Sequence, residues 1–141
     1  MFVFIAADRR LPLIEFDRRG PSIHVREIDE ETEGSVRTFF SAPHVYYVGT
    51  HEKCSCGFSY GQEPEWEEED QVEISRKCTG LLRQYVEQAL NNVDRVELLA
   101  CWSESVGQPP LRRYSGGPGI IGGDAFWFED RDFYQLERVP A

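Results

Sequence analysis

Hydrophobic residues occur along the chain in several short runs and one long periodic stripe, and these patterns predict most of its elements. Residues 2–6 and 45–48 are continuous apolar runs rich in β-branched and aromatic side chains, which is typical of strands buried on both faces. Residues 93–102 begin with alternation and end fully apolar, so they predict another core strand. Residues 23–28 alternate apolar positions with polar ones, His24 among them, which predicts a further strand.

One helix is predicted from a stripe with helical spacing. It begins near Asp70, which can accept hydrogen bonds from the first-turn amides, with Glu73 three residues on as in a capping box. Gly80 lies inside it at a cost of about 1 kcal/mol relative to alanine, which predicts a close approach to another backbone. The helix ends at Asn91 and Asn92. Its apolar stripe contains Ile74, Cys78, Leu81, Leu82, Tyr85, Ala89 and Leu90.

The remaining segments predict shorter elements. Residues 35–40 favour a helical turn, and residues 56–60 favour a strand that returns from the preceding turn. Residues 111–114 predict an edge strand. Residues 125–128 and 132–139 predict a final pair of strands around a turn, because both are rich in aromatic side chains.

Together these elements predict a single compact α+β domain over residues 1–141. One main helix packs on a mixed or antiparallel sheet of about five to seven strands. The length of 141 residues and the 40% share of hydrophobic residues suit one domain with one core. The sequence contains no internal repeat and no linker that would divide it.

The net charge of the chain disfavours two classes of binding partner. Its 15 basic and 25 acidic residues give a net charge of −10, which repels phosphate backbones and anionic membrane surfaces. No apolar run approaches the roughly 18 residues of a membrane span. The apolar run at residues 2–6 precedes its charges, which is the reverse of a secretory signal. We therefore expect a soluble cytoplasmic protein with no nucleic-acid or membrane partner and with reduced cysteines.

The stretch after the strand at residues 45–48 concentrates the reactive side chains. It contains His51, Cys54 and Cys56 in the pattern His-x-x-Cys-x-Cys. Zinc binds imidazole nitrogen and thiolate sulfur, and a tight turn can bring such donors to one ion. The pattern therefore predicts a zinc site, whose fourth ligand would be Cys78, His44, a carboxylate or water. The sequence lacks the second cysteine pair of common structural zinc sites.

Three alternatives to zinc remain open. The turn can be purely structural, because free cysteine often behaves as a small apolar residue. A thiol-dependent redox enzyme could use Cys54 and Cys56, with His51 lowering a thiol pKa, although the spacing is not Cys-x-x-Cys. A protein-interaction module could form a homodimer through an edge strand or the aromatic C-terminal pair. The sequence thus predicts a small binding or structural module and indicates no particular small-molecule ligand.

Overall fold

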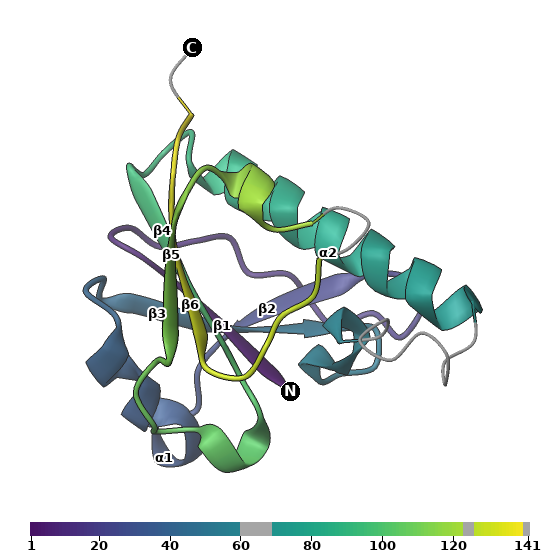
Figure 1. Ribbon diagram of the computed structural model, residues 1–141, viewed down its shortest axis with the longest axis horizontal. Coiled ribbons are helices and arrows are strands. Elements are labelled where there is room, and N and C mark those ends of the chain that lie inside the picture. Colours follow the sequence, from purple (N-terminus) through teal and green to yellow (C-terminus); the bar gives the residue numbers. More distant parts are fainter. Residues whose placement is uncertain (60–68, 123–125, 140–141) are drawn as a thin grey trace.

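The computed structural model describes residues 1–59, 69–122 and 126–139, and these residues form one α+β domain around a six-stranded sheet in the order β2-β3-β1-β4-β6-β5 (Figure 1). Neighbouring strands are antiparallel except β5 and β6, which are parallel, so the sheet is mixed. The predicted fold class is confirmed. The strands are β1 (Phe2–Ala7), β2 (Ile23–Glu27), β3 (His44–Thr50), β4 (Arg95–Cys101), β5 (Arg112–Gly116) and β6 (Asp132–Glu137).

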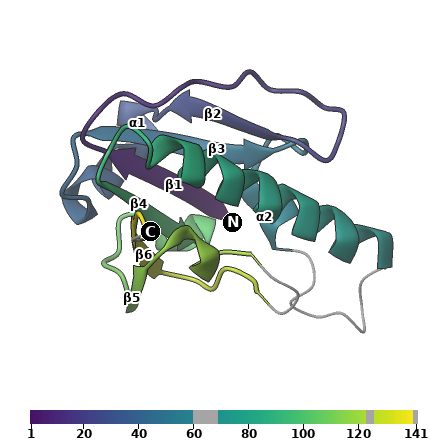
Figure 2. The ribbon, with the colours of Figure 1, turned by 90° about the horizontal axis from the view of Figure 1, so that it is seen from above.

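The long helix α2 (Glu69–Ala89) lies along one face of this sheet (Figure 2). Its stripe residues Cys78 and Leu82 are fully buried in one hydrophobic cluster with strand side chains such as Val48. Since the helix already includes Glu69, Asp70 lies in its first turn, and the predicted capping role of Asp70 is wrong. The cap itself falls outside the described residues. The close approach predicted at Gly80 is also wrong, because no described atom lies within 4 Å of the position its Cβ would take.

Two short helical segments cover part of the opposite face. They are α1 (Glu30–Glu33), which is capped by the Asp29 side chain, and η1 (Gly34–Phe39), which confirms the predicted helical turn. A second cluster forms beneath them from side chains of several strands. It includes Phe4, Val36, Tyr47, Leu99 and Phe133. Beyond these segments, the edge of β2 is joined by Ile14, which bridges Val25 from the long connection after β1.

Two predicted strands are wrong. Residues 55–58 form the 3-10 turn η2 (Ser55–Phe58), while Tyr60 falls outside the described residues. Residues 126–128 have no strand partner among the described residues, and β6 pairs with β4 and β5 instead. Phe128 is nevertheless fully buried, with its ring 6.0 Å from that of Phe58. Phe128 is therefore buried by core packing and not by pairing in the sheet.

Candidate functional site

The turn after β3 directs its predicted donors to different sides of the sheet. The backbone N–H of His51 donates to the Ser22 carbonyl at 3.1 Å. Its ring lies against Gly20, where a Cβ would fall 2.5 Å from Cγ of the imidazole. The Nδ1 atom of His51 lies 3.7 Å from Sγ of Cys78 on α2. The imidazole therefore faces the helix layer, and Cys78 does reach it, as the sequence allowed for a fourth ligand.

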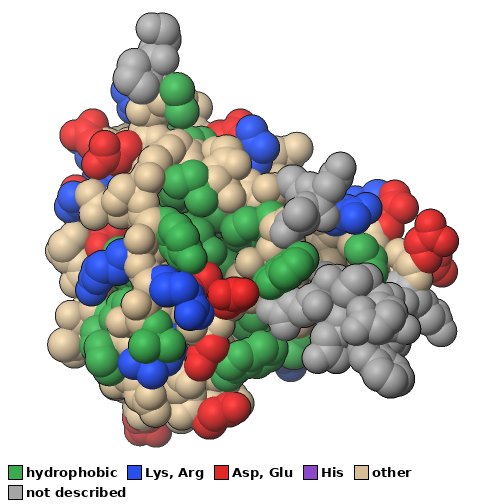
Figure 3. Space-filling model, in the orientation of Figure 1, with side chains coloured by type: hydrophobic (Ala, Val, Ile, Leu, Met, Phe, Trp, Pro, Cys, Tyr) green, Lys and Arg blue, Asp and Glu red, His purple; other side chains and the backbone are tan. Residues whose placement is uncertain are grey.

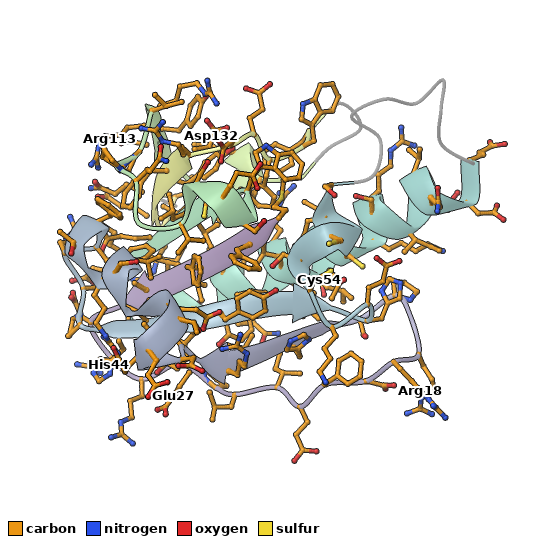
Figure 4. All side chains as sticks on the ribbon, turned by 90° about the horizontal axis from the view of Figure 1, so that it is seen from below. Arg18, Glu27, His44, Cys54, Arg113 and Asp132 are labelled. Carbon is orange, nitrogen blue, oxygen red and sulfur yellow. The ribbon has the colours of Figure 1, made fainter. Side chains whose placement is uncertain are left out.

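Cys54 instead lines a cavity on the face that carries α1. Its sulfur accepts a 3.3 Å hydrogen bond from the backbone N–H of Cys56, so the two cysteines are neighbours at the start of η2. His44 begins β3, whereas Cys54 follows the end of that strand. Figure 4 accordingly shows His44 and Cys54 well apart, near opposite ends of β3. A seven-residue strand spans about 20 Å, so His44 is too far away to share a metal ion with Cys54.

The predicted zinc site therefore gains no support from this geometry. No group of three or more His, Cys, Asp or Glu side chains that could hold a metal ion occurs among the described residues. His51 and Cys78 form one pair of donors, and Cys54 and Cys56 form another. Zinc binding by His51, Cys54 and Cys56 stays a prediction, which the metal content of purified, untagged protein would test. Less than about a tenth of an equivalent would contradict it.

The surroundings of Cys54 and Cys78 favour thiols over thiolates. Burial and the neighbouring Cys56 raise the pKa of the Cys54 thiol. Burial also raises the pKa of Cys78 to about 11. A reactive cysteine needs a lowered pKa to be a thiolate near neutral pH. A thiol enzyme using Cys54 and Cys56 therefore stays a prediction, without electrostatic support at Cys54.

A cavity lies beside Cys54. It has a volume of about 750 Å³ and lies over β2, β3 and the start of β1, on the face that α1 and η1 leave uncovered. We call it the β2–β3 cavity. Its surface is mostly apolar, with charged groups around it. It is lined by Phe2, Leu13, Ile14, Glu15, Phe16, His24, Val25, Arg26, Glu27, Glu33, Tyr47, Glu52, Lys53 and Cys54.

Strand register builds the floor of the β2–β3 cavity. Arg26 of β2 lies opposite Tyr47 of β3, and its guanidinium sits 4.2 Å from the centre of the Tyr47 ring. The same guanidinium donates two hydrogen bonds, of 2.8 and 3.0 Å, to the carboxylate of buried Glu33 at the end of α1. A bidentate pair of this kind fixes both side chains. The floor is therefore preformed.

His24 is a buried ionisable residue that also lines this cavity. The residue as a whole is 6% exposed. Its ring packs perpendicular to the Phe16 ring, with the two ring centres 5.4 Å apart. Nδ1 lies 3.2 Å from the Thr50 carbonyl oxygen. The ring fits because residue 49 is glycine. A Cβ there would fall 2.5 Å from Nε2 of His24 and 2.7 Å from the Lys53 carbonyl oxygen.

Sequence reasoning missed His24 as a site residue. Alternation along residues 23–28 placed it opposite the apolar positions, which reads as a solvated face. The available signal was the continuous apolar run at residues 45–48, which predicted a strand covered on both faces. Burial lowers the pKa of His24, and the positive charges of Arg26 and Lys53 lower it further. The imidazole is therefore held in its neutral form.

A second, smaller hollow lies at the other edge of the sheet. All five residues of β5 are exposed, and the Tyr114 ring stacks on that of Tyr134 with centres 5.1 Å apart. Hydrophobic side chains alternate there with charged ones (Figure 3). A hollow of about 350 Å³ lies among Tyr114, Ile120, Phe126, Trp127, Glu129, Asp132 and Tyr134. Self-association through this edge stays a prediction.

Comparisons with known proteins do not decide between these sites. No family model, curated protein or solved structure matches the chain. In the ranges that the structure describes, no helix is long and apolar enough to cross a membrane. The β2–β3 cavity is the feature of the described residues whose chemistry best suits a ligand.

Proposed function

We propose that this protein is a binding module for a small, largely apolar molecule, which it holds in the β2–β3 cavity. The observation that carries the proposal is a preformed, mostly apolar hollow into which one buried imidazole opens. Sites for small molecules typically have volumes of about 300–1,000 Å³ and combine an apolar lining with a few fixed polar groups. The volume of about 750 Å³ lies within that range.

The rim of the cavity supports the same function. Leu13 is 61% exposed and Phe16 is 44% exposed, and both line the cavity. Large apolar side chains gathered around a hollow commonly mark a binding surface, whereas single exposed ones need no explanation. An apolar ligand would remove these side chains from water, which stabilises the complex by roughly 25 cal/mol for each Å² buried.

Two exposed leucines allow a matched test. Leu13 lines the cavity and is 61% exposed, while Leu111 precedes β5 at the other edge of the sheet and is 58% exposed. Binding of 2-naphthol would be followed by its fluorescence, and its site by amide chemical-shift mapping. We expect Leu13→Asp to weaken binding about fivefold through lost apolar contact and Leu111→Asp to change it less than about twofold.

Two outcomes would contradict the proposal. One is equal weakening by both substitutions, or amide shifts that avoid the cavity. The other is a chain that binds no probe but dimerises in sedimentation experiments, with Leu13→Asp abolishing the dimer. That second result would assign the cavity to another copy of the chain.

A further inference from the structure

We infer that the molecule held in the β2–β3 cavity is uncharged and donates a hydrogen bond to Nε2 of His24, as a phenol or another hydroxylated ring would. This inference rests on the proposed function and adds the chemical class of the ligand. It depends on the tautomer of His24, on the accessibility of Nε2 and on the charges around the cavity.

The tautomer follows from the contact at the other ring nitrogen. Nδ1 lies 3.2 Å from the Thr50 carbonyl oxygen, and a carbonyl oxygen can only accept a hydrogen bond. The proton of a neutral His24 imidazole must therefore be on Nδ1. Burial favours that neutral form, because it lowers the pKa of His24. Nε2 then carries a lone pair and acts as an acceptor only.

Nε2 is also open to a ligand. It makes no hydrogen bond within the residues that the structure describes, although His24 as a whole is 6% exposed. Every side-chain nitrogen or oxygen that is fully sealed in those residues has a partner, so Nε2 is not fully sealed. Since His24 lines the β2–β3 cavity, we take the cavity as its opening. A ligand hydroxyl that entered the cavity could donate a hydrogen bond to this acceptor.

The charges around the cavity disfavour an anion, and the face of Tyr47 is not free for a cation. Its lining includes four glutamates but only two basic residues, Arg26 and Lys53, so an anion would meet net negative charge. The basic side chain nearest the floor is already engaged, because Arg26 is paired with Glu33. A cationic ligand would find the face of Tyr47 taken by the same guanidinium. A neutral ring with one donor avoids both conflicts.

The test compares three ligands of one shape in titrations of the full chain near neutral pH. 2-Naphthol is neutral and has a donor, naphthalene lacks the donor, and 2-naphthoate carries a negative charge. We expect 2-naphthol to bind about tenfold more tightly than naphthalene, because only its hydroxyl pairs with Nε2. We expect 2-naphthoate to bind more weakly than 2-naphthol. Side-chain nitrogen NMR should show a shift of Nε2 of His24 with 2-naphthol and not with naphthalene.

A matched pair of variants isolates the imidazole. His24→Phe keeps a ring of similar size but removes the acceptor, so its preference for 2-naphthol over naphthalene should disappear. His44→Phe changes a histidine at the opposite end of β3 and should keep the preference of the original chain. If His24→Phe does not fold, the Nε2 shift in the unchanged protein decides the question.

The outcomes separate this inference from the proposed function. Equal binding of 2-naphthol and naphthalene in the cavity would overturn the role of His24 and leave the binding function intact. Tighter binding of 2-naphthoate would overturn the inference that the ligand is neutral. Failure of all three to bind in the cavity would overturn the proposed function and, with it, the inference.

Discussion

The two faces of the sheet are covered to different extents. On one face, α2 contributes 21 continuous helical residues, a length of about 30 Å, and buries Val25 and Val48 completely or nearly so. On the other face, α1 and η1 contribute four and six residues and leave the β2–β3 cavity beside them. The length of the helices packed on each face therefore determines which part of the sheet is fully buried and which part stays accessible to a ligand.

Alternation along the same two strands supplies both faces. Val25 of β2 pairs with Val48 of β3 and faces α2, whereas the next pair, Arg26 with Tyr47, faces the cavity. Successive side chains of a strand point to opposite faces, so a shift of one residue would exchange core and cavity. Burial of Val25 and Val48 beneath α2 therefore fixes the register that places Arg26 beside Tyr47 on the cavity face.

The largest effect should come from a cavity created on the sealed face. Leu82 of α2 is fully buried, so Leu82→Ala should lower the free energy of unfolding by about 3 kcal/mol through lost burial and an unfilled void. Leu13→Ala at the rim of the β2–β3 cavity should cost less than about 0.5 kcal/mol, because Leu13 is already largely in water. Urea denaturation would measure both. Similar losses would break the distinction between the faces.

The next effect concerns the glycine under His24. Gly49→Ala places a Cβ 2.7 Å from the Lys53 carbonyl oxygen and against the His24 ring, so the turn or the ring must move. We expect a loss of about 2 kcal/mol in the free energy of unfolding, typical of overpacking, together with weaker binding of 2-naphthol. The measurements are urea denaturation and the naphthol titration. Unchanged stability and affinity would show that His24 is not held by this contact.

A pH effect should come from the open face. Burial lowers the pKa of His24 from its ordinary value of 6.5, so the unfolded chain binds a proton there more readily than the folded one. The free energy of unfolding should therefore fall as the pH is lowered from 6.5 toward the folded pKa, and then level off.

His24→Phe should remove that part of the pH dependence. The raised pKa of Arg26 keeps its guanidinium charged in this range, and the raised pKa values of Tyr47 and Cys54 keep both of those groups neutral. The glutamates of the lining, Glu27 and Glu52 among them, face the cavity in both proteins, so the difference between the two curves isolates the imidazole. Parallel curves would contradict the assignment.

The smallest effect has the opposite sign. Gly80 lies inside α2 with no described atom within 4 Å of its Cβ position, so an added methyl group meets open space. Gly80→Ala should raise the free energy of unfolding by about 0.5–1 kcal/mol, because glycine is a poor helix former. Thermal unfolding would measure the change. A loss of stability would reveal a contact made by residues outside the described ranges.

The sequence predicted the elements whose patterns are unambiguous. Helix α2 followed from its apolar stripe, and β1, β3 and β4 followed from continuous apolar runs. The strand predicted at residues 125–128 was wrong, because aromatic side chains are equally hydrophobic in a connecting segment and in a strand. Phe128 is buried by its neighbours and not by pairing in the sheet. A run of hydrophobic residues indicates that a segment is buried. Whether that segment is a strand depends on whether another strand is available to pair with it.

The candidate site was harder to predict than the fold. Lys53 adopts a left-handed backbone conformation with φ of 74°, which no residue type in the turn signals, and the chain reverses between His51 and Cys54. The imidazole consequently faces Cys78 while the thiol of Cys54 faces the cavity. His24 was hidden for a different reason. Alternation shows which residues share a face but not what covers that face.

The position of β1 determines when this protein can complete its sheet during synthesis. β1 pairs with β3 on one side and with β4 on the other, and β4 ends at Cys101, so the sheet cannot close around β1 until Cys101 has left the ribosome. Until then, the nascent chain holds an aromatic and β-branched strand with an unpaired edge, which favours aggregation. Slower elongation after β3 should therefore lower the yield of native protein.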